Sequence, residues 1–222
     1  MKDRKLLNIE LGRITADEYV SKRPRSGIVL VLDNIRSAHN VGSAFRTADA
    51  FGVDKVYLGG ICPVPPSPEL HKVALGAEEV VPFQHVEDVV ALVKDLQADG
   101  STVIAVEQTV HSVKLNDFRL GCSPSGDSVP LRSTPAPPIV SCVPSGLVSN
   151  GPLPLPLSGG GQAPEGEHPN LYALVFGNEV AGVQQEVVDA CDFALEIPQQ
   201  GTKHSLNVSV SIGVVLWGIM AH

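Results

Sequence analysis

The chain has 222 residues, 43% of them hydrophobic and 18% charged, which is enough apolar material for one domain with a substantial core. Its formal net charge of −8 argues against a surface that coats nucleic acid throughout, although a local basic patch is compatible with that charge. No apolar run is long enough to cross a bilayer, and the N-terminal residues lack the apolar core of a secretory signal. We therefore expect a soluble cytoplasmic protein, with an organelle as the alternative compartment.

Apolar runs alternate with helical patterns between residues 27 and 119. This alternation predicts an α/β domain built on a parallel sheet with helices on both faces. Asn40 is available as the N-cap of the first helix, and Pro82 suggests that the third strand lies at a sheet edge. The predicted strands are 27–32, 55–58, 80–83 and 102–106, and the predicted helices are 41–51, 69–77 and 86–98.

Residues 120–169 have a different composition, rich in proline, glycine and serine and almost without periodicity. Such a segment cannot bury enough apolar surface to order itself, so we predict a disordered insertion between two adjacent elements. A functional lid and an artefact of gene prediction are the alternatives. Regular patterns return with strands at 171–176 and 193–197 and helices at 184–190 and 206–221. The domain is thus predicted to span 27–222, preceded by a short polar leader at 1–26.

The four cysteines form neither a Cys-x-x-Cys pair nor a Cys/His metal pattern. Without a secretory signal, a disulfide framework is not expected in a chain of this length. The sequence therefore predicts isolated free thiols and no bound metal.

Three polar segments stand at the ends of predicted strands. Residues 33–52 read DNIRSAHNVGSAFRTADAFG, residues 174–183 read LVFGNEVAGV, and residues 197–212 read IPQQGTKHSLNVSVSI. Their order and internal spacing resemble the three motifs of the SpoU (TrmH-like) family of the SPOUT superfamily. The resemblance covers roughly 27–119 and 170–222 and is interrupted by the predicted insertion.

The resemblance implies a parallel α/β fold with a C-terminal trefoil knot, which composition and periodicity alone would not suggest. It also implies a homodimer that binds S-adenosyl-L-methionine and transfers its methyl group to a ribose 2′-hydroxyl of tRNA or rRNA. By this resemblance the catalytic residues are Arg46, Asn40, Glu179, Ser205 and Asn207. The cofactor-binding residues are Thr109, Gly177, Ile197 and Leu206.

Arg46 is better suited to orienting the target ribose than to accepting a proton, because a guanidinium group stays protonated in proteins. It would also stabilise negative charge that develops on the 2′-oxygen. The candidate phosphate contacts are Lys22, Arg23, Arg25 and Arg36, although a solvated linker explains the cluster at 22–25 equally well.

Each motif also has a purely structural interpretation. Arg46 would then pair with Asp49 at the protein surface, and Gly177 would serve an ordinary turn. Ser205 would cap the last helix, with Leu206, Val208 and Val210 in the core.

Two other functions are compatible with the sequence. One is a catalytically inactive RNA-binding or assembly protein of the same fold, since the insertion precedes the strand that leads into the second motif. The other is a methyltransferase acting on an acceptor other than RNA, which the acidic net charge favours slightly.

Overall fold

The structure, a computed structural model, describes residues 4–6, 10, 26–118, 172–202 and 205–220. Its strands form one parallel seven-stranded sheet in the order β3-β2-β1-β6-β4-β7-β5, which confirms the predicted parallel α/β class. The strand order does not by itself establish the trefoil knot, which stays a prediction. The strands are β1 (Ile28–Asp33), β2 (Lys55–Gly59), β3 (Phe83–Val86), β4 (Thr102–Val106), β5 (Val113–Lys114), β6 (Tyr172–Phe176) and β7 (Phe193–Glu196).

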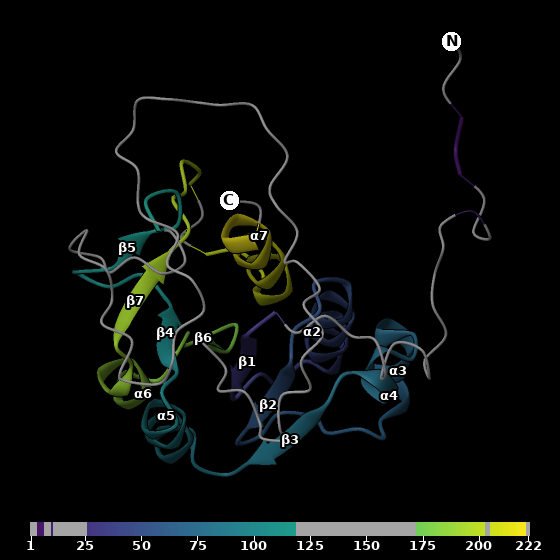
Figure 1. The fold of residues 1–222 in the computed structure, drawn as a ribbon, viewed down its shortest axis with the longest axis horizontal. Helices are drawn as coiled ribbons and strands as arrows, with labels where there is room; N and C mark the ends of the chain where they lie inside the picture. Colours follow the sequence, from purple (N-terminus) through teal and green to yellow (C-terminus); the bar gives the residue numbers. More distant parts are fainter. Residues whose placement is uncertain (1–3, 7–9, 11–25, 119–171, 203–204, 221–222) are drawn as a thin grey trace, which may run out of the picture.

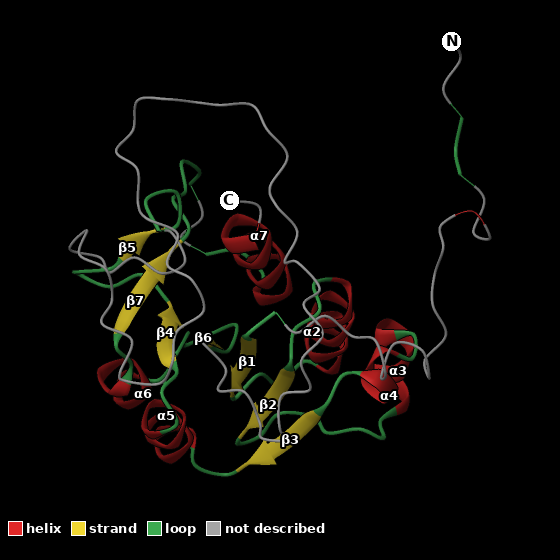
Figure 2. Ribbon diagram, in the orientation of Figure 1, coloured by secondary structure: helices red, strands yellow, loops and turns green. Residues whose placement is uncertain are grey.

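Helices cover both faces of the sheet, as predicted (Figures 1 and 2). The helices are α2 (Ala38–Ala50), α3 (Pro68–Ala74), α4 (Ala77–Val80), α5 (Val89–Ala98), α6 (Gln185–Ala190) and α7 (Val208–Met220). Among the described residues, no helix is long and apolar enough to span a membrane.

The fully buried strand β1 shows how the two layers form. Side chains of a strand alternate between the two faces of its sheet. Ile28, Leu30 and Leu32 therefore join the apolar cluster that contains α2 and α7. Val29 and Val31 point the other way, into the cluster that contains α5 and α6. The continuous apolar run in the sequence is thus explained by a strand that is covered on both sides.

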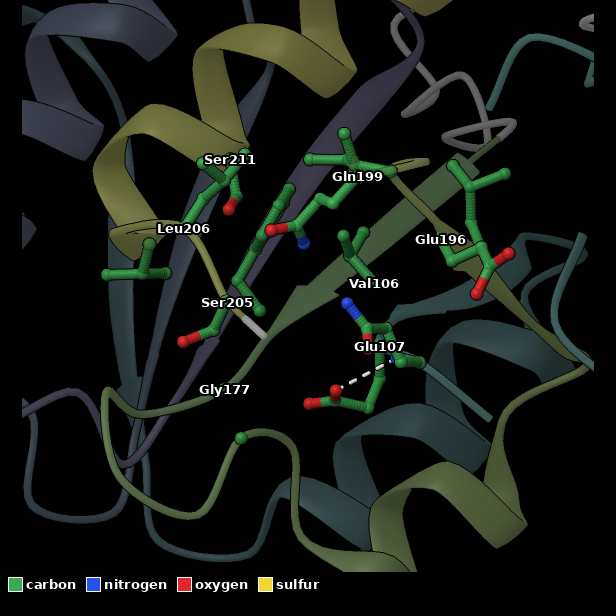
Figure 3. Close-up of a pocket in the computed structure, with 14 residues that line it drawn as sticks. Val106, Glu107, Gly177, Glu196, Gln199, Ser205, Leu206 and Ser211 are labelled. Carbon is green, nitrogen blue, oxygen red and sulfur yellow. Dashed lines mark hydrogen bonds between the residues drawn. The ribbon is translucent and has the colours of Figure 1, made fainter. Parts of the chain in front are cut away.

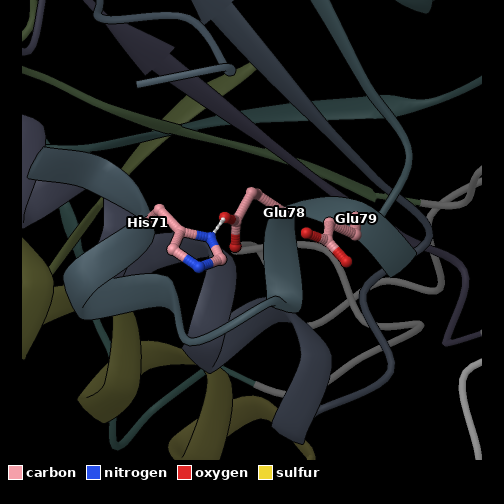
Figure 4. A group of neighbouring side chains, drawn as sticks. All are labelled: His71, Glu78 and Glu79. Carbon is pink, nitrogen blue, oxygen red and sulfur yellow. Dashed lines mark hydrogen bonds and ion pairs between the residues drawn. The ribbon is translucent and has the colours of Figure 1, made fainter. Parts of the chain in front are cut away.

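The predicted strand at 80–83 is wrong, because its first residue ends helix α4 and the edge strand β3 begins at Phe83. Helix α4 is held by the buried carboxylate of Glu78, which accepts a hydrogen bond from Gly76 N (3.1 Å) and contacts His71 Nδ1 of α3 (Figure 4). Potential metal-ligating atoms of His71, Glu78 and Glu79 lie within 4.8 Å of one another. Both oxygens of Glu78 already have partners in the protein, so we interpret the group as a link between two short helices.

The predicted helix at 41–51 begins earlier, at Ala38, and the predicted helix at 69–77 ends at Ala74. Helix α5 begins at Val89, later than predicted, because Asp88 caps it by accepting a hydrogen bond from Ala91 N (3.0 Å). Strand β5 was not predicted, since a strand of two residues has no periodicity to detect.

The predicted insertion at 120–169 lies outside the described residues, but the residues that flank it meet. The rings of Phe118 and Tyr172 pack edge to face, with their centroids 6.5 Å apart. A segment whose two ends meet can be lengthened at low cost, about 0.6 kcal/mol for each doubling of loop length. The fold therefore accommodates a long insertion at this point.

We predict that replacing residues 122–168 by a linker of about six glycine and serine residues leaves the fold intact. A linker of that length reaches roughly 20 Å, more than enough to join the two ends. The free energy of unfolding should stay the same or rise by no more than about 2 kcal/mol, corresponding to three halvings of loop length. Chemical denaturation of both proteins measures this, and a clear loss of stability would mean that the segment packs against the domain.

Candidate active site

The three motifs meet at the carboxyl edge of the sheet, in the loops that follow β1, β6 and β7. Ligands of parallel α/β sheets bind at this edge. The first direct link between motifs is a hydrogen bond of 2.5 Å from Asn40 Nδ2 to Glu179 Oε1, across 139 positions of sequence. Asn40 is 9% exposed, so its amide group is largely withdrawn from water.

Asn40 is not the helix cap that the sequence predicted. Helix α2 begins at Ala38, and its N-cap is Ser37, whose hydroxyl accepts a hydrogen bond from Asn40 N (3.3 Å). Asn40 consequently lies in the first helical turn, where its side chain is free to reach Glu179.

The second motif forms a tight turn at 178–182. Asn178 and Gly182 exchange two backbone hydrogen bonds of 3.0 Å, and Asn178 Oδ1 accepts from Val180 N (2.9 Å) and Ala181 N (2.7 Å). A Cβ atom on Gly177 would lie 1.9 Å from the carbonyl carbon of Gly182. Gly177 is therefore required by the close approach of its own turn, whatever it does toward a ligand.

A buried carboxylate fixes the far end of this turn to strand β1. Asp33 is fully buried, and its Oδ2 accepts a hydrogen bond from Gln184 N (3.0 Å). Its Oδ1 accepts from Asn34 Nδ2 (2.8 Å), and Asn34 Oδ1 accepts in turn from Ile61 N (3.2 Å). Asn34 adopts a left-handed conformation (φ 55°), which asparagine tolerates better than most residues. The loops after β1, β2 and β6 are thus tied together.

Cys62 and Cys191 are free thiols, as predicted for isolated cysteines, whereas Cys122 and Cys142 lie outside the described residues. Burial raises the pKa of the Cys62 thiol to about 11, so this thiol stays protonated at neutral pH. It donates to Leu32 O (3.3 Å), and its Sγ accepts from Ile35 N (3.2 Å). Cys62 therefore adds a further contact between the loops that follow β1 and β2.

A pocket of about 100 Å³, partly open to solvent, lies beside the turn (Figure 3). Its described lining comes from the ends of β4, β6 and β7 and from the start of α7. The lining residues are Val106, Glu107, Gln108, Phe176, Gly177, Gly182, Leu195, Glu196, Ile197, Gln199, Ser205, Leu206, Val208 and Ser211.

Four residues predicted to bind cofactor or substrate line this pocket, namely Gly177, Ile197, Ser205 and Leu206. Thr109 does not line it and instead forms a turn with Ser112, whose hydroxyl lies 3.0 Å from Thr109 O. The sequence analysis missed Glu107, which lies two positions before Thr109 at the end of β4. Its position directly after a predicted strand could have identified it, because ligands bind at the carboxyl ends of parallel strands.

Glu107 joins the pocket to the second motif. Its Oε2 accepts a hydrogen bond from Val183 N (3.0 Å), and its Oε1 accepts from Gln108 N (2.9 Å). A Cβ atom on Gly182 would lie 2.1 Å from Glu107 Oε2. A glycine at 182 consequently lets the carboxylate sit directly against the turn.

The last motif shows that Asn207, and not Ser205, caps helix α7. Asn207 Oδ1 accepts hydrogen bonds from Ser209 N (2.9 Å) and Ser209 Oγ (2.6 Å). Of the three residues assigned to the core in the structural interpretation, only Val208 is buried, whereas Leu206 and Val210 are 41% and 49% exposed. Leu206 faces the pocket instead.

Arg46 lies on the exposed side of α2, outside the residues that line the pocket. Among the described residues it forms no ion pair, so the surface pair with Asp49 expected from the structural interpretation is not formed. Arg36 is exposed in the loop before α2. The predicted phosphate contacts Lys22, Arg23 and Arg25 lie outside the described residues.

Comparison with known proteins places these motifs in a family. Residues 27–128 and 156–217 match the model of the SpoU rRNA Methylase family. The chain belongs to this family. The interruption of the match, between 128 and 156, falls within the segment predicted to be an insertion.

Similar curated proteins include the 23S rRNA (guanosine-2'-O-)-methyltransferases RlmB of Coxiella burnetii and Neisseria meningitidis. The first is 26% identical over 204 residues, which cover 90% of this chain and 60% of that protein. The second is 30% identical over 203 residues, which cover 90% and 59%. This SpoU-family chain therefore spans about three fifths of the length of the relatives that it matches.

Solved structures agree with the observed fold. The A. aeolicus TrmH/SpoU tRNA modifying enzyme superposes with a TM-score of 0.62 at 19% identity, covering 91% of this chain and 81% of that one. The AdoMet-bound rRNA methyltransferase from Sinorhizobium meliloti gives a TM-score of 0.60 at 20% identity, covering 88% and 56%. At these identities the likeness concerns the fold alone.

We predict that Gly177→Ala destabilises the protein by about 2 kcal/mol or more, because the added methyl group collides with backbone that cannot move aside cheaply. For a domain of this size, that loss lowers Tm by roughly 5 °C. Gly201→Ala is the matched control, since its Cβ would have no neighbour within 4 Å. Thermal unfolding compares the two, and equal Tm values would show that the turn widens without strain.

Proposed function

We propose that this chain transfers a methyl group from S-adenosyl-L-methionine to a ribose 2′-hydroxyl of tRNA or rRNA. The observation that carries the proposal is the convergence of all three SpoU motifs at one sheet edge, beside a pocket lined by residues of the second and third motifs. The relatives named RlmB methylate guanosine 2′-oxygens of 23S rRNA according to their names, which supports RNA as the acceptor.

The pocket fits the proposed cofactor. Phe176, Leu195, Ile197, Leu206 and Val208 provide apolar walls of the kind that suit an adenine ring. From the family resemblance we assign backbone groups at Ile197 and Leu206, both in the pocket lining, to hydrogen bonds with the edge of that ring. When bound, the cofactor would supply a sulfonium methyl group: the carbon–sulfur bond would break with its electron pair staying on sulfur, the 2′-oxygen would form the new bond to carbon, and the hydroxyl proton would pass to solvent.

Positioning is the contribution that we assign to the motif residues. Transfer to an oxygen requires an in-line approach, and holding the reactants in that geometry is itself a large part of catalysis. Asn40 fixes the carboxylate of Glu179 at the sheet edge. Ser205 and Asn207 belong to the segment that leads from the pocket into α7, so they flank the proposed reacting centre.

We assign Arg46 to the RNA and not to the cofactor, because it is exposed and lies outside the pocket lining. A permanently charged guanidinium group suits a phosphate or a developing alkoxide. Arg36, together with Lys22, Arg23 and Arg25, would extend this cationic surface along the RNA backbone. We further propose a cytoplasmic location, with an organelle that contains its own tRNA and rRNA as the alternative.

Arg46→Ala is expected to lower methyl transfer from labelled S-adenosyl-L-methionine to unmodified tRNA and rRNA by about 100-fold, the effect of losing one donor to a developing oxyanion. Affinity for the cofactor should not change. Lys94→Ala, on α5 across the sheet, is the matched control and should transfer normally. Recovery of label in alkali-resistant 2′-O-methylnucleotides identifies the ribose as acceptor.

Two outcomes of that assay would contradict the proposal. If the intact chain binds the cofactor but labels neither RNA, then the acceptor is not RNA or the chain does not catalyse transfer. If Arg46→Ala and Lys94→Ala transfer equally well, the assigned role of Arg46 is wrong.

A homodimer is the second part of the proposal, and helix α7 supports it. One side of α7 packs in the core through Ile212, Val215 and Leu216. The other side exposes a stripe of apolar residues spaced three or four positions apart, which monomeric proteins seldom leave in water. This stripe consists of Val210, Val214, Trp217 and Met220, with Trp217 67% exposed. A second copy of the chain, presenting the same stripe across a two-fold axis, would cover it.

Val214→Glu should convert the dimer to a monomer, because it places a charge in an apolar interface at a cost of several kcal/mol. We expect the dissociation constant to rise about 100-fold or more. Trp217 is the only tryptophan of the chain, so its fluorescence emission should shift to longer wavelength as the dimer separates. Light scattering measures the mass directly. Val110→Glu, at a valine that is 93% exposed outside the stripe, is the control, and a wild-type monomer would refute the dimer.

A further inference from the structure

The pocket is lined by acidic and neutral groups only, as far as its described residues go. Glu107 and Glu196 are the two charged residues in that lining, and the remaining polar ones are amides and hydroxyls. No lysine, arginine or histidine stands among the described lining residues to neutralise them. The described part of this wall is therefore electronegative.

The carboxylate of Glu107 is fixed in position. The backbone N–H groups of Gln108 and Val183 each donate to one of its oxygens, and Gly182 leaves no side chain between it and the turn. Glu196 Oε2 lies 3.0 Å from Ser112 Oγ, which leaves its other oxygen unengaged by that contact. Neither carboxylate is neutralised by an ion pair among the described residues.

We infer that Glu107, assisted by Glu196, makes this pocket discriminate by charge between the methyl donor and its demethylated product. The inference rests on the proposed function, since it takes the pocket as the cofactor site. S-adenosyl-L-methionine carries a sulfonium, an ammonium and a carboxylate, for a net charge of +1. S-adenosyl-L-homocysteine has a neutral thioether in place of the sulfonium and a net charge of zero.

Charge is the main property in which these two ligands differ, because their shapes differ by one methyl group. Opposite charges in a pocket partly shielded from water attract each other, although solvent in an open pocket weakens that attraction. The attraction is lost when the methyl group leaves, since the sulfur then becomes neutral. The two carboxylates thus bind the donor more tightly than the product. The product therefore dissociates more readily and is exchanged for a new donor after each turnover.

Isothermal titration calorimetry of the full chain with each ligand separately tests this inference without any turnover. Wild-type protein should bind S-adenosyl-L-methionine about tenfold more tightly than S-adenosyl-L-homocysteine, a ratio equivalent to ~1.4 kcal/mol. Sinefungin, in which an amine-bearing carbon replaces the sulfonium, carries the same net charge as the donor and should bind like it. High salt should narrow the difference between donor and product.

Glu107→Gln and Glu196→Gln remove one charge each and keep a similar shape. We expect Glu107→Gln to lower the donor-to-product ratio of affinities about threefold or more and Glu196→Gln to lower it less, because Glu107 is held more rigidly. Glu186→Gln on α6, an exposed glutamate outside the pocket, is the matched control and should leave the ratio unchanged. Thermal unfolding checks that each variant is folded.

Two results would overturn the inference while leaving the proposed function intact. If Glu107→Gln weakens both ligands equally, Glu107 acts through a neutral hydrogen bond or by holding the turn. If the ratio of donor affinity to product affinity stays at its wild-type value in both pocket variants, the two carboxylates do not distinguish the ligands by charge. Failure of the wild-type protein to bind either ligand would instead refute the assignment of the pocket.

Discussion

The tight turn at 178–182, together with the two residues that follow it, is anchored by side chains from three separate parts of the chain. Asp33 at the end of β1 holds Gln184 N, Asn40 of α2 holds Glu179, and Glu107 after β4 holds Val183 N. These anchors lie 76, 139 and 151 positions away from the turn residues that they bind. The shape of the candidate active site depends on this convergence.

The Asp33 anchor costs more to lose than it contributes when formed. A buried donor or acceptor left without its partner costs about 1–3 kcal/mol, whereas a satisfied hydrogen bond contributes roughly 1 kcal/mol. Asp33 is fully buried, so removing either of its partners would leave part of a carboxylate unsatisfied in the interior. The turn is consequently confined to one geometry, which is what a site that aligns two reactants requires.

Helix α7 lies between the cofactor pocket and the proposed dimer interface. Its first turn follows directly from the pocket-lining Ser205 and Leu206, and its inner side packs into the core beside α2. Its outer side presents the apolar stripe that we assign to a second copy of the chain. A dimer formed there would place the interface and the cofactor pocket on the same helix, so that each would restrain the other.

The sequence by itself determined the layered fold and the location of the motifs. The apolar run of β1 and the stripe of α5 are local patterns, and local patterns are set by the period of the backbone. The three motifs, read in order, were enough to place Gly177, Ile197, Ser205 and Leu206 at one site. The predictions from the sequence were wrong where a local preference, such as that of asparagine for a helix cap, competed with a contact to a residue far along the chain. Only the tertiary structure decided that Ser37 caps α2 while Asn40 binds Glu179, and that Glu107 belongs to the pocket, because those contacts join residues that are far apart along the chain.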